Sequence, residues 1–322
     1  MRVSSSMIYS TGLQGLMTLQ SQMFQTQNQL STGRRMLTPA DDPIGASEAL
    51  EVTQSKGVNK QFLENQADAM MQIGTTEAVV AGVGERLTRI IEQAAEAKNP
   101  TLNDSQRGMI AAELKLNFNS ILEFANAQDG TGLYIFAGNK STVAGGPFVQ
   151  NTLVPPPAKY DLATTSVSYK GDAGGPAVQV SSSKQMPVSV NGIDVFMQVR
   201  TAQGDVIGES MFDSIQNLIA LVDPSDAVPF DLNELETAQT TLESGLAHVA
   251  NIRATLGARM NALDGLTKTS DDVNYLYDVR LAELQDLDYT EAISRFTRLQ
   301  TQLEATQLTF KQTSQLTLFN IL

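Results

Sequence analysis

Two adjacent carboxylates, Asp41 and Asp42, have types and spacing that could carry chemistry. Such a pair could bind a cation or exchange a proton as an acid–base pair. They are followed at once by Pro43, and an Asp before a Pro is a strong signal for the start of a helix. We therefore interpret Asp42 as a helix N-cap. Asp288 and Glu291 have the spacing of a similar helix-start box.

Three further motifs match catalytic or metal-binding signatures only loosely. Ser181 and Lys184 have a Ser-x-x-Lys spacing, but they lie in a Ser-rich, strand-like segment without the companion motifs of that enzyme class. Residues 129–132 (Asp-Gly-Thr-Gly) are typical of a turn, because Gly supplies a positive φ. His248 is the only His, and without a Cys or a second His it cannot complete a typical zinc site.

The composition narrows the classes of function. The 322 residues include 35 acidic side chains against 22 Lys and Arg, which gives a net charge of -13. This balance argues against binding to nucleic acid or to an anionic membrane surface, because both need a basic face. Cys is absent. We expect no enzymatic activity, no cofactor and no metal.

The spacing of apolar residues predicts the helices and strands that position these side chains. Residues 76–96 and 110–125 repeat apolar side chains at the spacing of one helix face, and residues 232–266 read as a long helix without Pro. Residues 131–207 hold nine of the 23 Gly and six of the 11 Pro. Alternation on both sides of Asn191-Gly192 predicts a β-hairpin there.

The order of helices, strands and helices predicts a mainly α fold with an inserted β-domain (α+β). We expect an elongated bundle of long helices from both chain ends, with a terminal coiled-coil core. We predict three domains, two of them discontinuous: residues 1–40 with 285–322 as the terminal core for assembly, residues 41–130 with 208–284 as a helical rod, and residues 131–207 as the β-rich outer domain.

The two ends of the chain share a seven-residue repeat, which is the pattern of a supercoiled helix. We predict that each end alternates an apolar residue with a Gln along the seam. These candidate assembly residues are Leu16, Gln20, Met23, Gln27 and Leu30 at the N-terminus, and Phe296, Gln300, Leu303, Gln307 and Phe310 at the C-terminus.

The termini are also almost without charge. Residues 3–33 carry no charged side chain, and after residue 304 only Lys311 is charged. A terminal helix of a monomer needs a charged, solvated face, whereas a polar but uncharged helix suits an assembly in which neighbours cover every face. The pattern favours termini that pair and polymerise, although two ordinary amphipathic helices in one bundle would also fit the repeat. We expect no membrane-spanning segment and no cleaved signal peptide.

Several segments resemble axial proteins of the bacterial flagellum, in particular the family of the third hook-associated protein at the hook–filament junction. Residues 30–35 (Leu-Ser-Thr-Gly-Arg-Arg) are similar to a segment shared with flagellins. In residues 38–43 (Thr-Pro-Ala-Asp-Asp-Pro) the final Pro favours junction proteins over flagellins. The further similar segments are residues 1–9, 134–138, 169–172, 253–261, 286–293 and 316–322.

This resemblance implies a structural protein that joins hook to filament as a layer on which flagellin polymerises. It implies unfolded export through the flagellar type III apparatus, and so a secreted protein in the extracellular flagellum. The implied partners are copies of the chain itself, the first hook-associated protein, flagellin or the filament cap, and an export chaperone.

The main alternative is flagellin itself. A secreted hydrolase would need a clustered site, which residues 131–207 do not offer, and an adhesin or signalling role of the β-domain stays open.

Residues 201–252 hold nine acids and no Lys or Arg. We interpret this acidic segment as a solvated helix face. The alternative is an electrostatic contact with a basic neighbour or an export chaperone. In that case, neutralising Asp231, Glu234 and Glu236 weakens the complex in a salt-dependent way.

Overall fold

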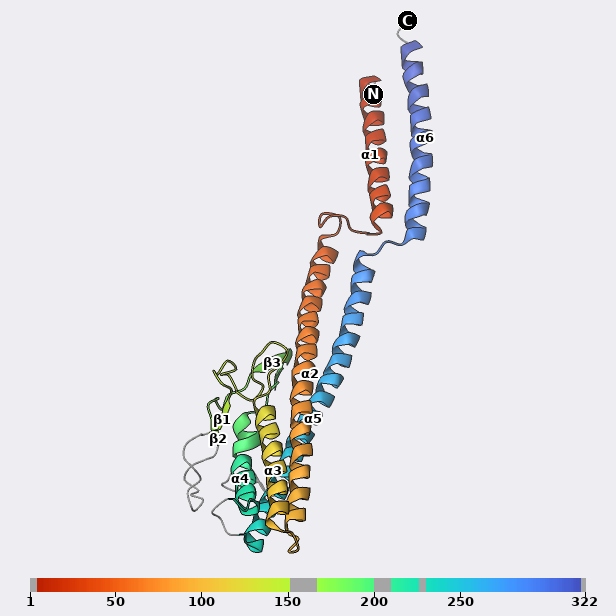
Figure 1. The fold of residues 1–322 in the computed structure, drawn as a ribbon. Helices are drawn as coiled ribbons and strands as arrows, with labels where there is room; N and C mark the ends of the chain where they lie inside the picture. Colours follow the sequence, from red (N-terminus) through yellow and green to blue (C-terminus); the bar gives the residue numbers. More distant parts are fainter. Residues whose placement is uncertain (1–4, 151–166, 200–209, 226–229, 320–322) are drawn as a thin grey trace. The chain divides into compact units, whose positions relative to one another are not determined.

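The computed structural model describes residues 5–150, 167–199, 210–225 and 230–319. The described residues form six α-helices, one π-helix and four short strands (Figure 1). The helices are α1 (Ser5–Thr32), α2 (Pro43–Ala97), α3 (Asp104–Ala125), α4 (Met211–Val222), α5 (Leu232–Gln285) and α6 (Tyr289–Phe319), with the π-helix η1 at Ile193–Met197. The predicted class, mainly α with an inserted β region, is confirmed.

The chain divides into two compact units. One contains the described residues up to Lys60 together with those from Asp271 onward, and the other contains those from Gln61 to Ser270. Both α2 and α5 contribute to each unit. The three-domain boundaries proposed from the sequence stay a prediction.

The unit of residues 61–270 has a continuous apolar core. The helical stripe predicted on residues 76–96 is largely buried, with Val80, Leu87 and Ile90 fully so, and the stripe of α3 is largely buried around Leu114 and Ile121. Each side chain of this size stabilises the fold by about 1.5–3 kcal/mol when buried. This core therefore gives the unit its own folding free energy.

The helix ends follow local rules. Asn103 caps α3 in a reciprocal capping box with Gln106, and the Ser210 hydroxyl accepts from the Asp213 N–H at the start of α4. The predicted cap at Asp42 is confirmed, because its carboxylate accepts from the Gly45 N–H at 3.0 Å. The helices α2 and α5 run well beyond the predicted segments.

The β region consists of two small antiparallel sheets. β1 (Phe148–Gln150) pairs with β2 (Val167–Tyr169), and β3 (Ala177–Ser181) pairs with β4 (Lys184–Pro187). An aromatic cluster joins the first sheet to the helices, with Phe148 and Phe212 centroids 5.6 Å apart. Part of the predicted domain 131–207, namely residues 151–166 and 200–207, lies outside the described residues.

The predicted hairpin at Asn191-Gly192 is wrong. The Asn191 side chain accepts from the Ile193 N–H, and the chain enters η1 instead of a strand. Adjacent Val195 and Phe196 are both fully buried, whereas a strand of a sheet with one solvent-facing side buries only every second side chain. Tertiary packing therefore overrides the local turn signal, and the hairpin forms at Ser181–Lys184.

Within the described ranges, no helix is both long and apolar enough to cross a membrane.

Candidate assembly site in the terminal helix pair

Helices α1 and α6 pack side by side as an antiparallel pair. Tyr9 and Phe310 have ring centroids 5.1 Å apart, and at the other end Gly33 lies against the Tyr289 hydroxyl. The N-terminal half of α1 therefore meets the C-terminal half of α6 (Figure 1). The two ends of the sequence form one structural element, as the matching repeats predict.

The seam of this pair has a definite register. In α1 the inward positions are Leu16, Leu19, Met23, Thr26 and Leu30. In α6 they are Phe296, Leu299, Leu303, Thr306 and Phe310. Steps of three and four residues alternate along both helices, which is the spacing of a coiled-coil seam.

This register corrects the predicted second seam position. Gln20, Gln27, Gln300 and Gln307 are exposed. The prediction placed the second seam residue four positions after each apolar residue. In the paired helices, the next inward residue lies three positions after it. The apolar members of the predicted set do face the partner helix, and the role of all ten residues in contacts between copies stays a prediction.

The outward side of the pair is unusually apolar. Phe24 is 60% exposed and Met17 59% exposed, and Leu13 lies at a compatible helical position on α1. On α6, Ile293 and Leu308 are exposed. Single exposed apolar residues are ordinary, but a series along an uncharged helix is typical of a surface that another protein covers.

The joint between the terminal pair and the adjoining parts of α2 and α5 is held by backbone bonds. The Arg35 N–H donates to Gln285 O at 2.7 Å, and the Leu287 N–H donates to Gly33 O at 3.0 Å. Gly33 has φ +70, and a Cβ there would lie 2.8 Å from the Tyr289 hydroxyl oxygen. Glycine is therefore needed where α1 ends.

Polar side chains complete the joint. The Arg35 guanidinium donates to Leu284 O at 3.0 Å and to the Asp42 carboxylate at 3.2 Å. Backbone N–H groups of Thr38 and Leu37 hold the pKa of Asp41 below its usual range. The Gly45 N–H, helped by Arg35, lowers the pKa of Asp42. The paired carboxylates therefore organise the loop.

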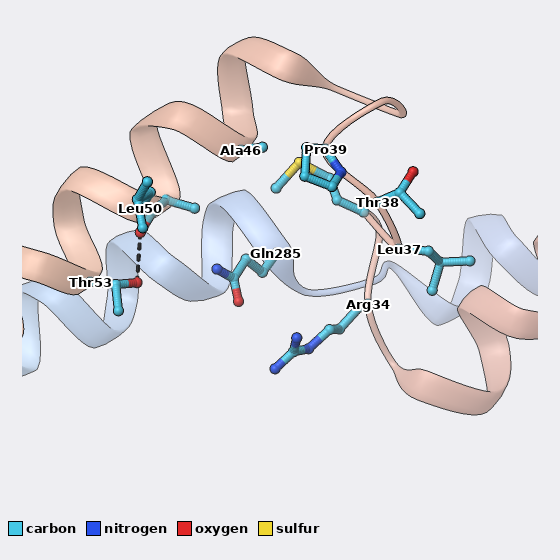
Figure 2. A pocket seen from close by; sticks show the side chains of 10 residues that line it. Arg34, Leu37, Thr38, Pro39, Ala46, Leu50, Thr53 and Gln285 are labelled. Carbon is cyan, nitrogen blue, oxygen red and sulfur yellow. Dashed lines mark hydrogen bonds between the residues drawn. The ribbon is translucent and has the colours of Figure 1, made fainter.

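A hollow of about 260 Å³ lies beside this loop (Figure 2). Its lining is mainly apolar and includes Leu37, Pro39, Ala46 and Leu50, with Arg34 at its border. A second hollow, of about 360 Å³, lies on the α1–α6 pair and is mainly polar. Neither brings together a nucleophile and a base.

The remaining chemical candidates lie elsewhere, in structural roles. The Asp129 carboxylate accepts from the Thr131 hydroxyl and from the Leu133 N–H, which confirms a turn. Ser181 and Lys184 face each other across the β3–β4 hairpin. His248 Nε2 lies 2.5 Å from Asp194 O. In the part of the chain that the structure describes, no three His, Asp or Glu side chains are grouped to hold a metal ion.

Sequence reasoning missed Leu19, Thr26, Leu299 and Thr306 as seam residues, and Arg35 as the centre of the joint. The first four carry a signal, because alternate steps of three and four from Leu16 and Phe296 reach them. Arg35 carries none, because two of its partners, Leu284 and Gln285, lie near the far end of the sequence.

Comparison with known proteins agrees with this architecture. The family model of the bacterial flagellin N-terminal helical region matches residues 3–141, and that of the C-terminal helical region matches residues 239–322. The flagellar junction protein FlgL from Legionella pneumophila has a similar fold, with a TM-score of 0.57 and 18% identity over 74% of this chain and 100% of that one.

Full-length similarity is to one type of flagellar protein. The chain is 28% identical to flagellar hook-associated protein 3 of Salmonella typhimurium, over 100% of this chain and 99% of the relative. Flagellin of Shigella flexneri is 24% identical over 79% of this chain and only 44% of the flagellin. These findings define a flagellin-like structural protein of the bacterial flagellum. Within that class, the chain is similar over its whole length to hook-associated protein 3.

Proposed function

We propose that this chain forms the layer that joins hook to filament and on which flagellin polymerises. The observation that carries the proposal is the α1–α6 pair, whose α1 helix is uncharged and exposes a series of apolar side chains. A second supporting observation is the full-length similarity to hook-associated protein 3, since flagellin matches less of the chain.

The proposed assembly uses the terminal pair as the inner core. Residues 1–40 and 285–322 pack against the same residues of other copies, with the exposed Gln20, Gln27, Gln300 and Gln307 contributing amide groups that seek partners. Residues 41–130 and 208–284 form the rod, and residues 131–207 face outward.

The partners follow from position in the flagellum. The first hook-associated protein lies on the hook side, and flagellin or the filament cap lies on the other. The chain leaves the cell unfolded through the type III apparatus, held beforehand by an export chaperone. It acts in the extracellular flagellum and has no catalytic role.

Physical chemistry supports growth on a template. Ordering a residue costs about 1–2 kcal/mol in backbone entropy. A thin two-helix seam offsets little of that cost, so the terminal pair orders stably only when many neighbours contribute contacts at once. Assembly is therefore confined to a surface that already presents those neighbours.

The test is deletion of the gene in its own host, with imaging of the cell surface and assay of flagellin in the medium. Bare hooks with unpolymerised flagellin in the medium support the junction role. Missing filaments with no flagellin anywhere would show that this chain is the flagellin. Normal filaments in a strain without a second copy of the gene would contradict both.

A further inference from the structure

The few charges of the terminal pair are unevenly matched. Helix α1 has none, and α6 carries Glu291, Arg295, Arg298, Glu304 and Lys311. Glu291 and Arg295 form an ion pair within the helix at 2.5 Å. Arg298 and Glu304 are exposed, and across the described residues neither has an ion-pair partner.

Arg298 borders a hollow that suits a carboxylate. The hollow of about 360 Å³ on the α1–α6 pair is lined by Arg295 and Arg298 and by Gln22, Gln25 and Gln29. Guanidinium and amide N–H groups both donate to carboxylate oxygens. In a chain with a net charge of -13, this recess brings two basic side chains beside the uncharged helix α1.

Arg298 and Glu304 cannot pair within one helix. Pairs along a helix form at spacings of three or four residues, whereas these two are six apart. At 100° and 1.5 Å per residue they point about 120° apart and lie about 9 Å apart along the axis. Each charge therefore needs a partner from another molecule when the surface becomes covered.

We propose that Arg298 of one copy pairs with Glu304 of the next copy in the junction layer. This inference rests on the proposed function, because it takes copies of the chain as neighbours. Two different surfaces of one helix then meet in a head-to-tail contact, which repeats from copy to copy as a ring or helical layer requires. The pairing also offsets the cost of burying charge in the packed core.

The charges of α6 indicate that the ion-pair partner is a second copy of the chain. The two unmatched groups are equal in number and opposite in sign, and both lie on the helix that the layer would repeat. A stagger of about 9 Å between neighbouring α6 helices brings Glu304 level with Arg298. A carboxylate in the recess would also lie beside Gln22, which lines the same hollow.

The test exchanges the two charges in the deletion strain. Arg298→Glu and Glu304→Arg, each alone, place like charges in contact, and we expect each to lower the number of attached filaments by at least about tenfold. The double variant Arg298→Glu/Glu304→Arg restores the pair with reversed polarity, and we expect filament number to return to within about twofold of wild type. Co-expression of the two single variants restores filaments as well, because alternate copies then match.

The matched control is Lys268→Glu, a charge reversal at an exposed site whose partner Asp264 lies on the same helix. We expect it to leave filament number unchanged. Immunoblots of the medium check that every variant is exported. Single variants with normal filaments, or a double variant as defective as the singles, would overturn the inference. The deletion phenotype tests the junction role separately, so the two can fail independently.

Discussion

The terminal helix pair and the core of residues 61–270 are built from the same kind of amphipathic helix but differ in how far they bury their apolar residues. In the core, Leu87, Ile90 and Leu114 are fully buried. In the pair, the best-buried seam residue of the predicted set, Leu303, is 8% exposed, and Phe24 on the outer side is 60% exposed. The core completes itself within one chain, whereas the pair leaves apolar surface for neighbours. Folding and assembly are thereby assigned to different parts of the molecule.

Hydrogen exchange on the isolated chain gives the sharpest form of this comparison. We expect amides of α3 and α4 to open only with global unfolding, which costs about 5–15 kcal/mol in a typical domain. Amides of α1 and α6 should open at about 1–2 kcal/mol or less, because their seam is less completely buried than the core of residues 61–270. Equal protection of both regions in the monomer would contradict the idea that the pair depends on neighbours.

Removing a core aromatic side chain tests the stability of residues 61–270, whose core is completed within one chain. Phe212 is fully buried and contacts Phe118, Phe148 and Phe196. We expect Phe212→Ala to lower the free energy of unfolding by about 3–5 kcal/mol, through lost burial and a cavity. Chemical denaturation followed by circular dichroism measures this. The exposed Leu116→Ala serves as the control and should cost less than about 1 kcal/mol.

A charge on the α1–α6 seam tests the terminal pair, which leaves apolar surface for neighbouring copies. We expect Leu303→Asp and Met23→Asp each to reduce attached filaments at least about tenfold, because a carboxylate must be buried without a partner. Circular dichroism should show the unfolding of residues 61–270 unchanged. Leu116→Asp, on an exposed face of α3, is the matched control. Normal filaments with either seam variant would show that the seam is wrongly assigned.

The smallest expected effect concerns the ion pair between Lys115 and Asp223 in the core region, whose contribution to stability depends on pH. Burial alone would raise the pKa of Asp223, but hydrogen bonds from Lys115 and Ser225 outweigh it and lower the pKa to about 2. Since the folded pKa lies below the unfolded value, this stabilisation is present above about pH 4 and is lost as the pH falls through about 2.

We expect Asp223→Asn to cost about 1–2 kcal/mol at pH 7 and much less near pH 2, as measured by denaturation at both values. The range is modest because the Lys115 side chain is half exposed. A cost that does not change with pH would show that the contribution is not electrostatic.

Much of the fold could be predicted from local patterns. The apolar stripes of residues 76–96 and 110–125 appear in α2 and α3, and Asp42 caps α2 as its position before Pro43 indicates. These features depend on contacts within a few turns of chain. The full length of α2 and α5 was not predicted, because the cross-helix bonds that support their ends, such as Lys56 with Asp278 and Arg280 with Glu48, join distant segments.

By itself, the sequence determined that both termini are helical, that they share a seven-residue repeat, and that they lack the charge a solvated helix needs. Only the tertiary structure decided which side chains complete the seam and that residues 193–197 form a π-helix instead of a strand. A repeat fixes the period of a helix face, but the choice between a step of three and a step of four depends on the helix packed against it. Likewise, a turn signal fixes where the backbone can bend, and burial of Val195 and Phe196 decides which structure follows.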